Sequence, residues 1–303
     1  MSSAPTDGII SVDKPHGITS MDVVRRVKRA SGIKRVGHGG TLDPIATGLI
    51  PICVGQATRM MEYLVDSSKE YSGVVELGVS TDTYDSEGEV TQTSDVDHLD
   101  RGQVETALET FRGQIDQVPP MYSALKKDGK RLYELARQGI EVEREPRVVN
   151  VYDIELVDWT LPLATVRVHC GRGFYMRSLA HDLGQALGCG GHLKSLVRQR
   201  SGPFKLQDSV TLEDLEESFS DGTWADHFHS PDAVLVNLPV IIAGRQTQEM
   251  IRNGRPISVG TADLANPEND RCRAYTADGG FIAIMRFDAP LRQWKPEKVF
   301  HTG

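Results

Sequence analysis

Apolar residues recur at helical spacing in several stretches of the chain. In 18–32, "ITSMDVVRRVKRASG", Val23 and Val27 belong to an apolar stripe, which predicts a helix with Ser20 as its N-cap and Gly32 as its C-terminal stop. The same spacing predicts two more helices, in 100–115 and 176–188. The acidic stretch 211–228 predicts a solvated helix followed by a loop.

Other stretches alternate between apolar and polar residues. The segment 70–90, "EYSGVVELGVSTDTYDSEGEV", alternates and then turns at polar residues and Gly88, which predicts strands around a hairpin. A further strand is predicted directly before the helix in 176–188. Beyond about residue 235, the stretches "LVNLPV", "TQEMIRNGRPIS" and "RAYTADGGFIAIMRF" indicate a small β-rich module, with Asp278-Gly279 as a tight hairpin turn. The pattern predicts an α/β or α+β domain followed by a small β-rich one.

Length and composition are those of a soluble globular protein. The 303 residues are 39% hydrophobic and 25% charged, and no apolar run reaches the roughly 18 to 20 residues that a membrane helix needs. The N-terminus lacks the basic start and apolar core of a signal peptide. The four cysteines lie far apart without a C-x-x-C pair, which favours a reducing, cytoplasmic compartment and signals neither disulfides nor zinc.

The net charge of −8 is unevenly spread along the chain. Residues 1–60 carry +4 and residues 61–118 carry −11. Residues 119–147 carry +2, residues 148–205 carry +3, and residues 206–303 carry −6. Because local patches rather than net charge attract polyanions, the acidic total does not exclude a nucleic-acid partner.

The stretch 37–59, "GHGGTLDPIATGLIPICVGQATR", is the first candidate site. Its glycines permit unusual torsions and close approach of another molecule, and Pro44 fixes the backbone directly after Asp43. The apolar residues that follow could anchor the loop: Leu49, Ile50, Ile52 and Val54. We expect a shaped loop that presents Asp43; the alternative is an irregular turn in which the carboxylate only satisfies loop amides.

Two basic surfaces could contact nucleic acid. The segment 119–147 mixes lysine and arginine with Tyr122 and Tyr133, which suits backbone contacts and base stacking on RNA. The alternative is an ordinary basic surface helix after a loop. The outer face of the first helix carries four basic residues, Arg25, Arg26, Lys28 and Arg29. This face either contacts phosphates or is simply solvated.

Arg177 lies in the first turn of a predicted helix, where the helix dipole disfavours a cation. A carboxylate from elsewhere in the fold would compensate the charge, and Asp43 is a candidate. A solvated arginine is the alternative.

Several catalytic motifs are missing. The chain contains no phosphate-binding P-loop, no H-E-x-x-H zinc motif and no G-x-S-x-G elbow. One loop-borne carboxylate beside basic and aromatic surfaces remains. That combination suits acid–base or covalent chemistry at a sugar carbon, on a substrate held by its phosphates.

These residues carry a resemblance to a known family. The Asp43 stretch resembles the catalytic motif of the bacterial tRNA pseudouridine synthase B (TruB) family. The family's other motifs follow in order over residues 8–212: "GIISVDKPHGITSMDVV", "KEYSGVVELGVSTDTYDSEGEV", "PPMYSALKKDGKRLYELARQGIEVEREPR", "GRGFYMRSLAHDLG" and "GCGGHLKSLVRQRSGPF". The tail resembles the small RNA-binding PUA-type domain of these enzymes.

The resemblance implies a pseudouridine-synthase fold, a mixed central sheet flanked by helices, over residues 1–234. It implies that 119–147 is an insertion that clasps the RNA, and that 235–303 is PUA-like. The implied reaction isomerises uridine to pseudouridine at position 55 in the tRNA T loop, with no metal or organic cofactor.

The resemblance also assigns site residues. Asp43 matches the catalytic aspartate, Tyr71 the aromatic that stacks on the flipped base, and Arg177 the arginine that pairs with the carboxylate. The implied substrate-binding set is His38, which supports the displaced nucleotide, Leu196, an apolar pocket residue, and the basic residues Arg59, Lys69, Lys126, Lys127, Lys130 and Arg137. Arg59 departs from the lysine of many members, which keeps the charge but changes the hydrogen-bond geometry.

The implied partner is the tRNA T stem-loop, with no membrane, no obligatory protein partner and a monomeric enzyme in the cytoplasm. Two rivals stay open: an RNA-binding or tRNA-folding protein on the same scaffold, and a pseudouridine synthase that acts on another RNA. An intact set of Asp43, Tyr71 and Arg177 speaks against the first rival. The basic insertion favours tRNA over the second.

Overall fold

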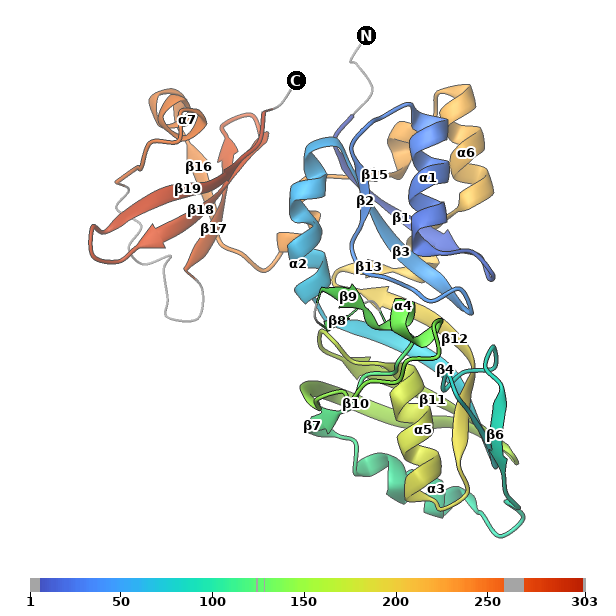
Figure 1. Ribbon diagram of the computed structural model, residues 1–303. Helices are drawn as coiled ribbons and strands as arrows, with labels where there is room; N and C mark the ends of the chain where they lie inside the picture. The colour runs from blue at the N-terminus through green and yellow to red at the C-terminus, as the bar shows by residue number, and fades with distance from the viewer. Residues whose placement is uncertain (1–5, 124, 128, 259–269, 302–303) are drawn as a thin grey trace. The chain divides into compact units, whose positions relative to one another are not determined.

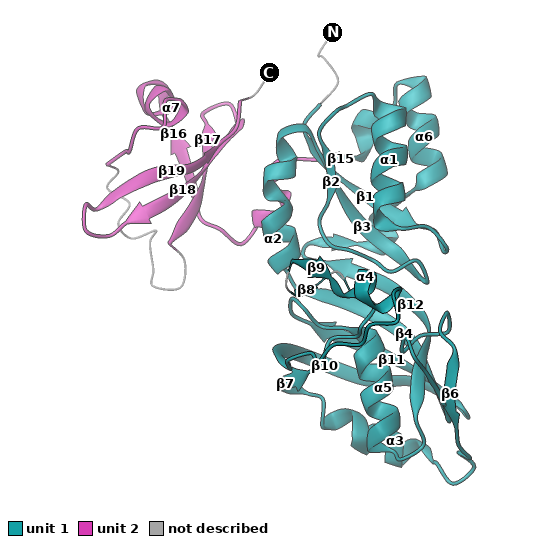
Figure 2. Ribbon diagram, in the orientation of Figure 1, with its two compact units in different colours: residues 1–228 teal, residues 229–303 magenta. Residues whose placement is uncertain are grey.

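The chain forms two compact units, residues 1–228 and 229–303 (Figure 2). The computed structural model describes residues 6–123, 125–127, 129–258 and 270–301. Each unit has a hydrophobic core of its own. No helix in these described ranges is long and apolar enough to cross a membrane.

The first unit is built on one large mixed sheet (Figure 1). Most neighbours pair antiparallel, whereas the β1/β14 and β3/β12 pairs are parallel. The strand order is β14 (Val210–Thr211), β1 (Gly8–Lys14), β3 (Ala46–Val54), β12 (Gly191–Ser201), β4 (Lys69–Leu77), β11 (Leu163–Cys170), β10 (Arg147–Thr160) and β7 (Gly113–Gln117). Three short strands pair at its margins: β2 (Val36–His38), β13 (Phe204–Lys205) and β15 (Phe228–His229).

Strand β3 is the apolar anchor that the sequence predicts after Asp43. Leu49, Ile50, Ile52 and Val54 are all 0% exposed, because β3 lies inside the sheet between β1 and β12. Such a nearly continuous apolar run is typical of a strand that is covered on both faces. The anchor is confirmed.

Helices flank the sheet, which confirms the predicted fold class. The helices α1 (Ser20–Ser31) and α6 (Leu212–Asp221) pack on each other, and the Arg26 guanidinium of α1 donates to the Glu216 carboxylate of α6 (Figure 1). Helix α5 (Met176–Ala186) packs on β12 and β4, and α3 (Arg101–Glu109) packs on β10. The short helix α2 (Met61–Asp66) follows a 3-10 helix, Gly55–Met60.

The start of α1 differs from the prediction. Its N-cap is Thr19, which forms a capping box with Asp22, so the proposed Ser20 cap is wrong. The Ser20 hydroxyl instead donates to the carbonyl of Leu42 and accepts from the Leu42 amide. Ser20 is a residue type that favours helix N-caps, but in this fold its side chain makes a long-range contact with Leu42 instead.

The two remaining irregular regions of this unit contain hairpins. Strands β5 (Val79–Thr81) and β6 (Val90–Thr93) pair as the sequence predicts. In the basic segment, β8 (Lys126–Lys127) and β9 (Lys130–Arg131) pair ahead of the short helix α4 (Leu132–Ala136).

In its described residues, the second unit contains a four-stranded sheet, one α-helix and a 3-10 helix, Pro231–Leu235. Its strand order is β16 (Val240–Ala243), β17 (Arg271–Thr276), β18 (Phe281–Asp288) and β19 (Gln293–Val299). The predicted Asp278-Gly279 turn joins β17 to β18, and Gly279 has a φ of +89°. The stretch "TQEMIRNGRPIS" was expected in a β-rich module but supplies most of α7 (Arg245–Arg252).

A close helix–strand approach gives a stability prediction. A Cβ on Gly184 of α5 would lie 2.2 Å from the carbonyl carbon of Gly190, which is backbone and cannot yield. We expect Gly184→Ala to lower the free energy of unfolding by about 1–3 kcal/mol, because overpacking forces backbone shifts. The matched control is Gly102→Ala in the exposed first turn of α3, where the Cβ would meet only the end of the Asp100 side chain, at 3.3 Å. Helix propensity and this contact oppose each other, so the free energy of unfolding should change by less than about 1 kcal/mol. Equal urea-unfolding midpoints for the two variants would contradict this.

Candidate active site

Asp43 lies on the loop between β2 and β3, and the loop backbone is tied down on both sides of it. The Asp43 carbonyl accepts from the amide of Ala46 at 3.1 Å. The next carbonyl, of Pro44, accepts from the amide of Gly17 at 2.9 Å and from Nζ of Lys14 at 3.4 Å. The carboxylate is still 35% exposed, so one side of a firmly held group faces the solvent.

Other parts of the protein pack closely against glycines of this loop and of the start of β3. A Cβ on Gly39 would lie 2.5 Å from Cδ1 of Leu64 in α2. Gly48 has a φ of +95°, and its Cβ would lie 2.6 Å from the carbonyl oxygen of Arg198. Both positions therefore need glycine for close packing. The sequence-based view that the glycines admit another molecule does not apply at these two positions.

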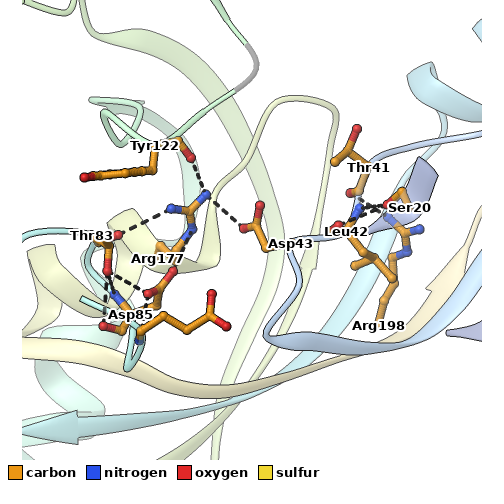
Figure 3. Close-up of polar contacts among 10 residues, drawn as sticks. Ser20, Thr41, Leu42, Asp43, Thr83, Asp85, Tyr122, Arg177 and Arg198 are labelled. Carbon is orange, nitrogen blue, oxygen red and sulfur yellow. Dashed lines mark hydrogen bonds and ion pairs between the residues drawn. The ribbon is translucent and has the colours of Figure 1, made fainter. Parts of the chain in front are cut away.

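Arg177 forms the ion pair that its position at a helix start calls for. Its guanidinium, only 4% exposed, lies 2.9 Å from Oδ2 of Asp43 (Figure 3). It also donates to the carbonyls of Tyr122 at 2.8 Å and Thr83 at 3.4 Å. The alternative of a solvated arginine is wrong.

A second carboxylate stands behind the same guanidinium. Oδ2 of Asp85 lies 3.6 Å from Nε of Arg177, and Asp85 is 4% exposed (Figure 3). Its other oxygen accepts from the hydroxyl of Thr83 at 2.6 Å and from the amide of Glu87 at 3.1 Å. One buried cation thus lies between two carboxylates, which offsets its desolvation and the unfavourable helix dipole.

The surroundings of Asp43 act on its protonation in opposite directions. Burial raises the pKa of the Asp43 carboxyl, and the nearby Asp85 raises it further, whereas Arg177 and Lys14 lower it. Lys14 is itself 0% exposed, and burial lowers the pKa of its amine to about 8. The two cations thus oppose the effect of burial and favour the ionised form of the carboxylate.

Residues of β4, β12 and α5 form the apolar and aromatic surroundings of the carboxylate. Leu196 on β12 is 7% exposed and pairs with Gly73 of β4. Tyr71, two residues before Gly73, is partly buried, and burial raises the pKa of its hydroxyl. Tyr175 directly precedes α5, where burial and the charge of Asp43 raise the pKa of its hydroxyl. Asp43 therefore pairs with Arg177 and acts electrostatically on the hydroxyl of Tyr71. Leu196 pairs in the sheet with Ala46, three residues after Asp43.

In the chain, His38 precedes the Asp43 loop and Arg59 follows the anchor strand β3. His38 ends β2 and accepts the amide proton of Gly40 on Nδ1 at 3.4 Å. Burial lowers the pKa of this imidazole, and Arg198 lowers it further, so the ring is neutral at pH 7. Arg59 lies half-buried in the 3-10 helix Gly55–Met60.

The other basic candidates lie apart from the carboxylate. Lys69 is 6% exposed, and its amine donates to the carbonyls of Leu64, Val65 and Ser67 at the end of α2. Its charge therefore stabilises the end of a helix. Four exposed side chains of the basic segment remain on the surface: Lys126, Lys127, Lys130 and Arg137.

Sequence reasoning missed four residues of this site. Asp85 was read as part of a polar hairpin turn, and nothing in its neighbours indicates the arginine that it meets. Lys14 and Arg198 are fully buried cations that bind backbone carbonyls, which no local pattern predicts. Tyr175 could have been found, because it lies two residues before Arg177 in the same motif.

The arrangement can perform carboxylate chemistry on a substrate that reaches the open side of Asp43. A fixed ionised carboxylate is a nucleophile or a base, and Arg177 aims it. No group of three or more His, Cys, Asp or Glu side chains that could hold a metal ion occurs among the described residues.

Comparisons with known proteins agree with this chemistry. Residues 28–176 match the N-terminal domain of TruB family pseudouridylate synthases, and residues 177–236 match the C-terminal domain of tRNA pseudouridylate synthase B. The chain belongs to the TruB family. It is therefore a pseudouridylate synthase, an isomerase of uridine.

Similar proteins cover nearly the whole chain. A tRNA pseudouridine synthase B of Dehalococcoides mccartyi is 48% identical over 294 residues, which is 97% of this chain and 96% of the relative. One from Dechloromonas aromatica is 45% identical over 278 residues, 92% and 90% of the two chains. Among solved structures, a chain of a Cbf5-Nop10-Gar1 complex has a TM-score of 0.75 at 26% identity and covers 98% of this chain and 85% of its own.

The ion pair gives a prediction about pH dependence in this TruB family member. The Arg177→Met substitution should raise the pKa of Asp43 further, because Arg177 is the largest of the effects that lower this pKa against the effect of burial. If Asp43 carries out the chemistry, activity needs its ionised form and is lost as the pH falls through that pKa. The acid limb of the pH–rate profile should therefore move to higher pH, and the plateau rate should fall by about 100-fold or more.

Arg177→Lys should restore little, since a point charge cannot copy a planar fork. The control is Arg172→Met, which removes an exposed arginine close to the same helix. Single-turnover rates measured across the pH range decide the matter. An unshifted acid limb in Arg177→Met would contradict the assigned electrostatics.

Proposed function

We propose that this synthase isomerises the uridine at position 55 in the T loop of tRNA, with Asp43 as the catalytic residue. Uridine isomerisation in tRNA follows from the family and from the name that its relatives share. The finer proposal rests on one observation above all. A single carboxylate, held on a tied loop and paired with a buried arginine, keeps one side open to a substrate.

The reaction breaks the N1–C1′ bond of uridine, turns the base and joins C5 to C1′. N1 gains a proton and C5 loses one, so the product is an isomer and no redox partner is needed. A base must leave its stack before the glycosidic bond can be reached. Asp43 either attacks C1′ or removes a ribose proton, and both steps need the ionised, aimed carboxylate that Arg177 supports.

The surroundings of Asp43 suit a flipped nucleotide. We assign Tyr71 to stacking on the base and Leu196 to the apolar wall beside it, because both lie on adjacent central strands. His38, neutral at pH 7, supports the nucleotides that take the place of the displaced base. Arg59 contacts a phosphate. Lys69 is left out of this set, because its amine is occupied by three carbonyls.

The rest of the tRNA is held by basic surfaces. We assign residues 119–147 as an insertion that closes over the T stem-loop through Lys126, Lys127, Lys130 and Arg137. We further assign residues 1–234 as the catalytic domain and 235–303 as a PUA-like RNA-binding domain. The enzyme acts as a monomer in the cytoplasm; its four cysteines are buried free thiols, which suits a reducing compartment.

If Asp43 is the catalytic residue, its replacement should affect the rate of isomerisation much more than the affinity for tRNA. In Asp43→Asn, isomerisation should be abolished while tRNA affinity falls by less than about tenfold, or about 1.4 kcal/mol, because the carboxylate makes no phosphate contact. Pseudouridine is mapped after incubation of each protein with unmodified tRNA transcript. Wild-type protein that binds and folds tRNA but leaves position 55 as uridine would favour the RNA-folding rival, and turnover by Asp43→Asn would refute the assignment.

The assigned RNA-binding lysines predict that the affinity for tRNA depends strongly on salt, despite the net charge of −8. Lysines that contact phosphates release counterions, so the affinity should fall steeply with salt. Replacing Lys126, Lys127 and Lys130 together by glutamate should flatten the slope of log Kd against log salt. Replacing the same three by arginine keeps the charge and serves as the control. An identical slope in both triple variants would exclude this hairpin from the RNA interface.

A further inference from the structure

Arg198 is a buried cation that donates to three backbone carbonyls and also interacts with the hydroxyl of Tyr71. It lies on β12, is 1% exposed and forms no ion pair in the part of the chain that the structure describes. Its Nε donates to the carbonyl of Leu49 at 2.7 Å, and its two terminal nitrogens donate to those of Gly40 at 3.2 Å and Thr41 at 3.4 Å. One planar guanidinium therefore binds three carbonyls in a fixed arrangement.

These three carbonyls bracket the catalytic loop. Gly40 and Thr41 precede Asp43, and Leu49 lies just inside β3, where the loop ends. In Figure 3, Asp43 lies between Arg177 and the group that contains Thr41 and Arg198. Arg198 therefore supports the loop from the side opposite to the ion pair.

The backbone of Arg198 belongs to the same junction. In the sheet, Arg198 pairs with Gly48 of β3 on one side and with Tyr71 of β4 on the other. Gly48 approaches the Arg198 carbonyl so closely that a Cβ there would clash. A single residue of β12 thus touches the end of the catalytic loop and adjoins the strand position of the stacking tyrosine.

A buried charge without a counter-charge is costly, and an apolar side chain would fill the same space at a lower cost. The carbonyl contacts give the arginine a role that an apolar residue cannot fill, because the planar fork fixes two separate pieces of backbone relative to each other. Misplacing a reacting group by about 1 Å can cost about 100-fold in rate.

We propose that Arg198 is a positioning residue, which sets the catalytic loop so that Asp43 meets both Arg177 and the substrate. The inference rests on the proposed role of Asp43. Arg198 acts through the loop backbone and through the hydroxyl of Tyr71, and it does not itself touch the substrate. Its loss should therefore slow the chemical step and leave the binding of tRNA nearly unchanged.

The test compares Arg198→Lys and Arg198→Met with the wild type and with Arg200→Met. Arg200 is the matched control, because it lies on the same strand but pairs with Glu70 and is partly exposed. We expect the single-turnover rate of isomerisation to fall by about 10-fold or more in Arg198→Lys and about 100-fold in Arg198→Met. The tRNA Kd should change by less than about threefold, and Arg200→Met should keep the wild-type rate.

The pH–rate profile separates positioning from a general loss of folded protein. If the loop moves away from Arg177, the pKa of Asp43 rises and the acid limb of Arg198→Lys shifts to higher pH. A smaller active fraction would lower the rate equally at every pH. An unshifted acid limb, an unchanged rate, or failure of both variants to fold would overturn the proposal. Inactive wild-type protein would instead overturn the proposed function.

Discussion

The buried guanidinium of Arg177 is the interaction on which the site depends. It begins α5 and meets Asp43 from the loop before β3, Asp85 from the turn after β5 and the Tyr122 carbonyl from the basic segment. Removing a cation from water is costly, so all of these segments must be correctly placed before the charge is satisfied. The ion pair therefore ties the chemistry to the completed fold.

The loop around Asp43 is made rigid mainly through its backbone. Lys14 and Arg198 donate to its carbonyls, and the hydroxyl of Ser20 bonds to both the amide and the carbonyl of Leu42. Each contact satisfies a polar group that burial would otherwise leave unpaired. Such a loop can present a carboxylate to a bulky substrate without collapsing onto it, because its position does not depend on the carboxylate itself.

Basic residues in this protein have two different uses. Lys14, Lys69, Arg177 and Arg198 are buried and bind backbone carbonyls or carboxylates within the fold. The lysines of the β8–β9 hairpin are exposed instead, although Nζ of Lys127 donates to the carbonyl of Glu143 at 2.6 Å. The net charge of −8 hides this division, since an acidic surface elsewhere outweighs a local basic one.

Local features could be predicted from the amino-acid sequence alone. The apolar stripe of α1, the anchor strand β3 and the Asp278-Gly279 turn each depend on neighbouring residues, so their patterns appear directly in the chain. The electrostatic problem of Arg177 at a helix start was also visible, and it pointed to Asp43. The motifs of the Asp43 loop indicated the family.

Only the tertiary structure decided which polar side chains meet. Asp85 faces Arg177, and Lys69 donates to carbonyls at the end of α2. Ser20 holds the Asp43 loop instead of capping α1, and Arg198 donates to carbonyls of the same loop. Several of these pairs are far apart in the chain, and the partners are often backbone carbonyls, which every residue carries. The sequence therefore cannot mark them in advance; they arise when strands β3, β4 and β12 come together and burial forces each charge to find a partner.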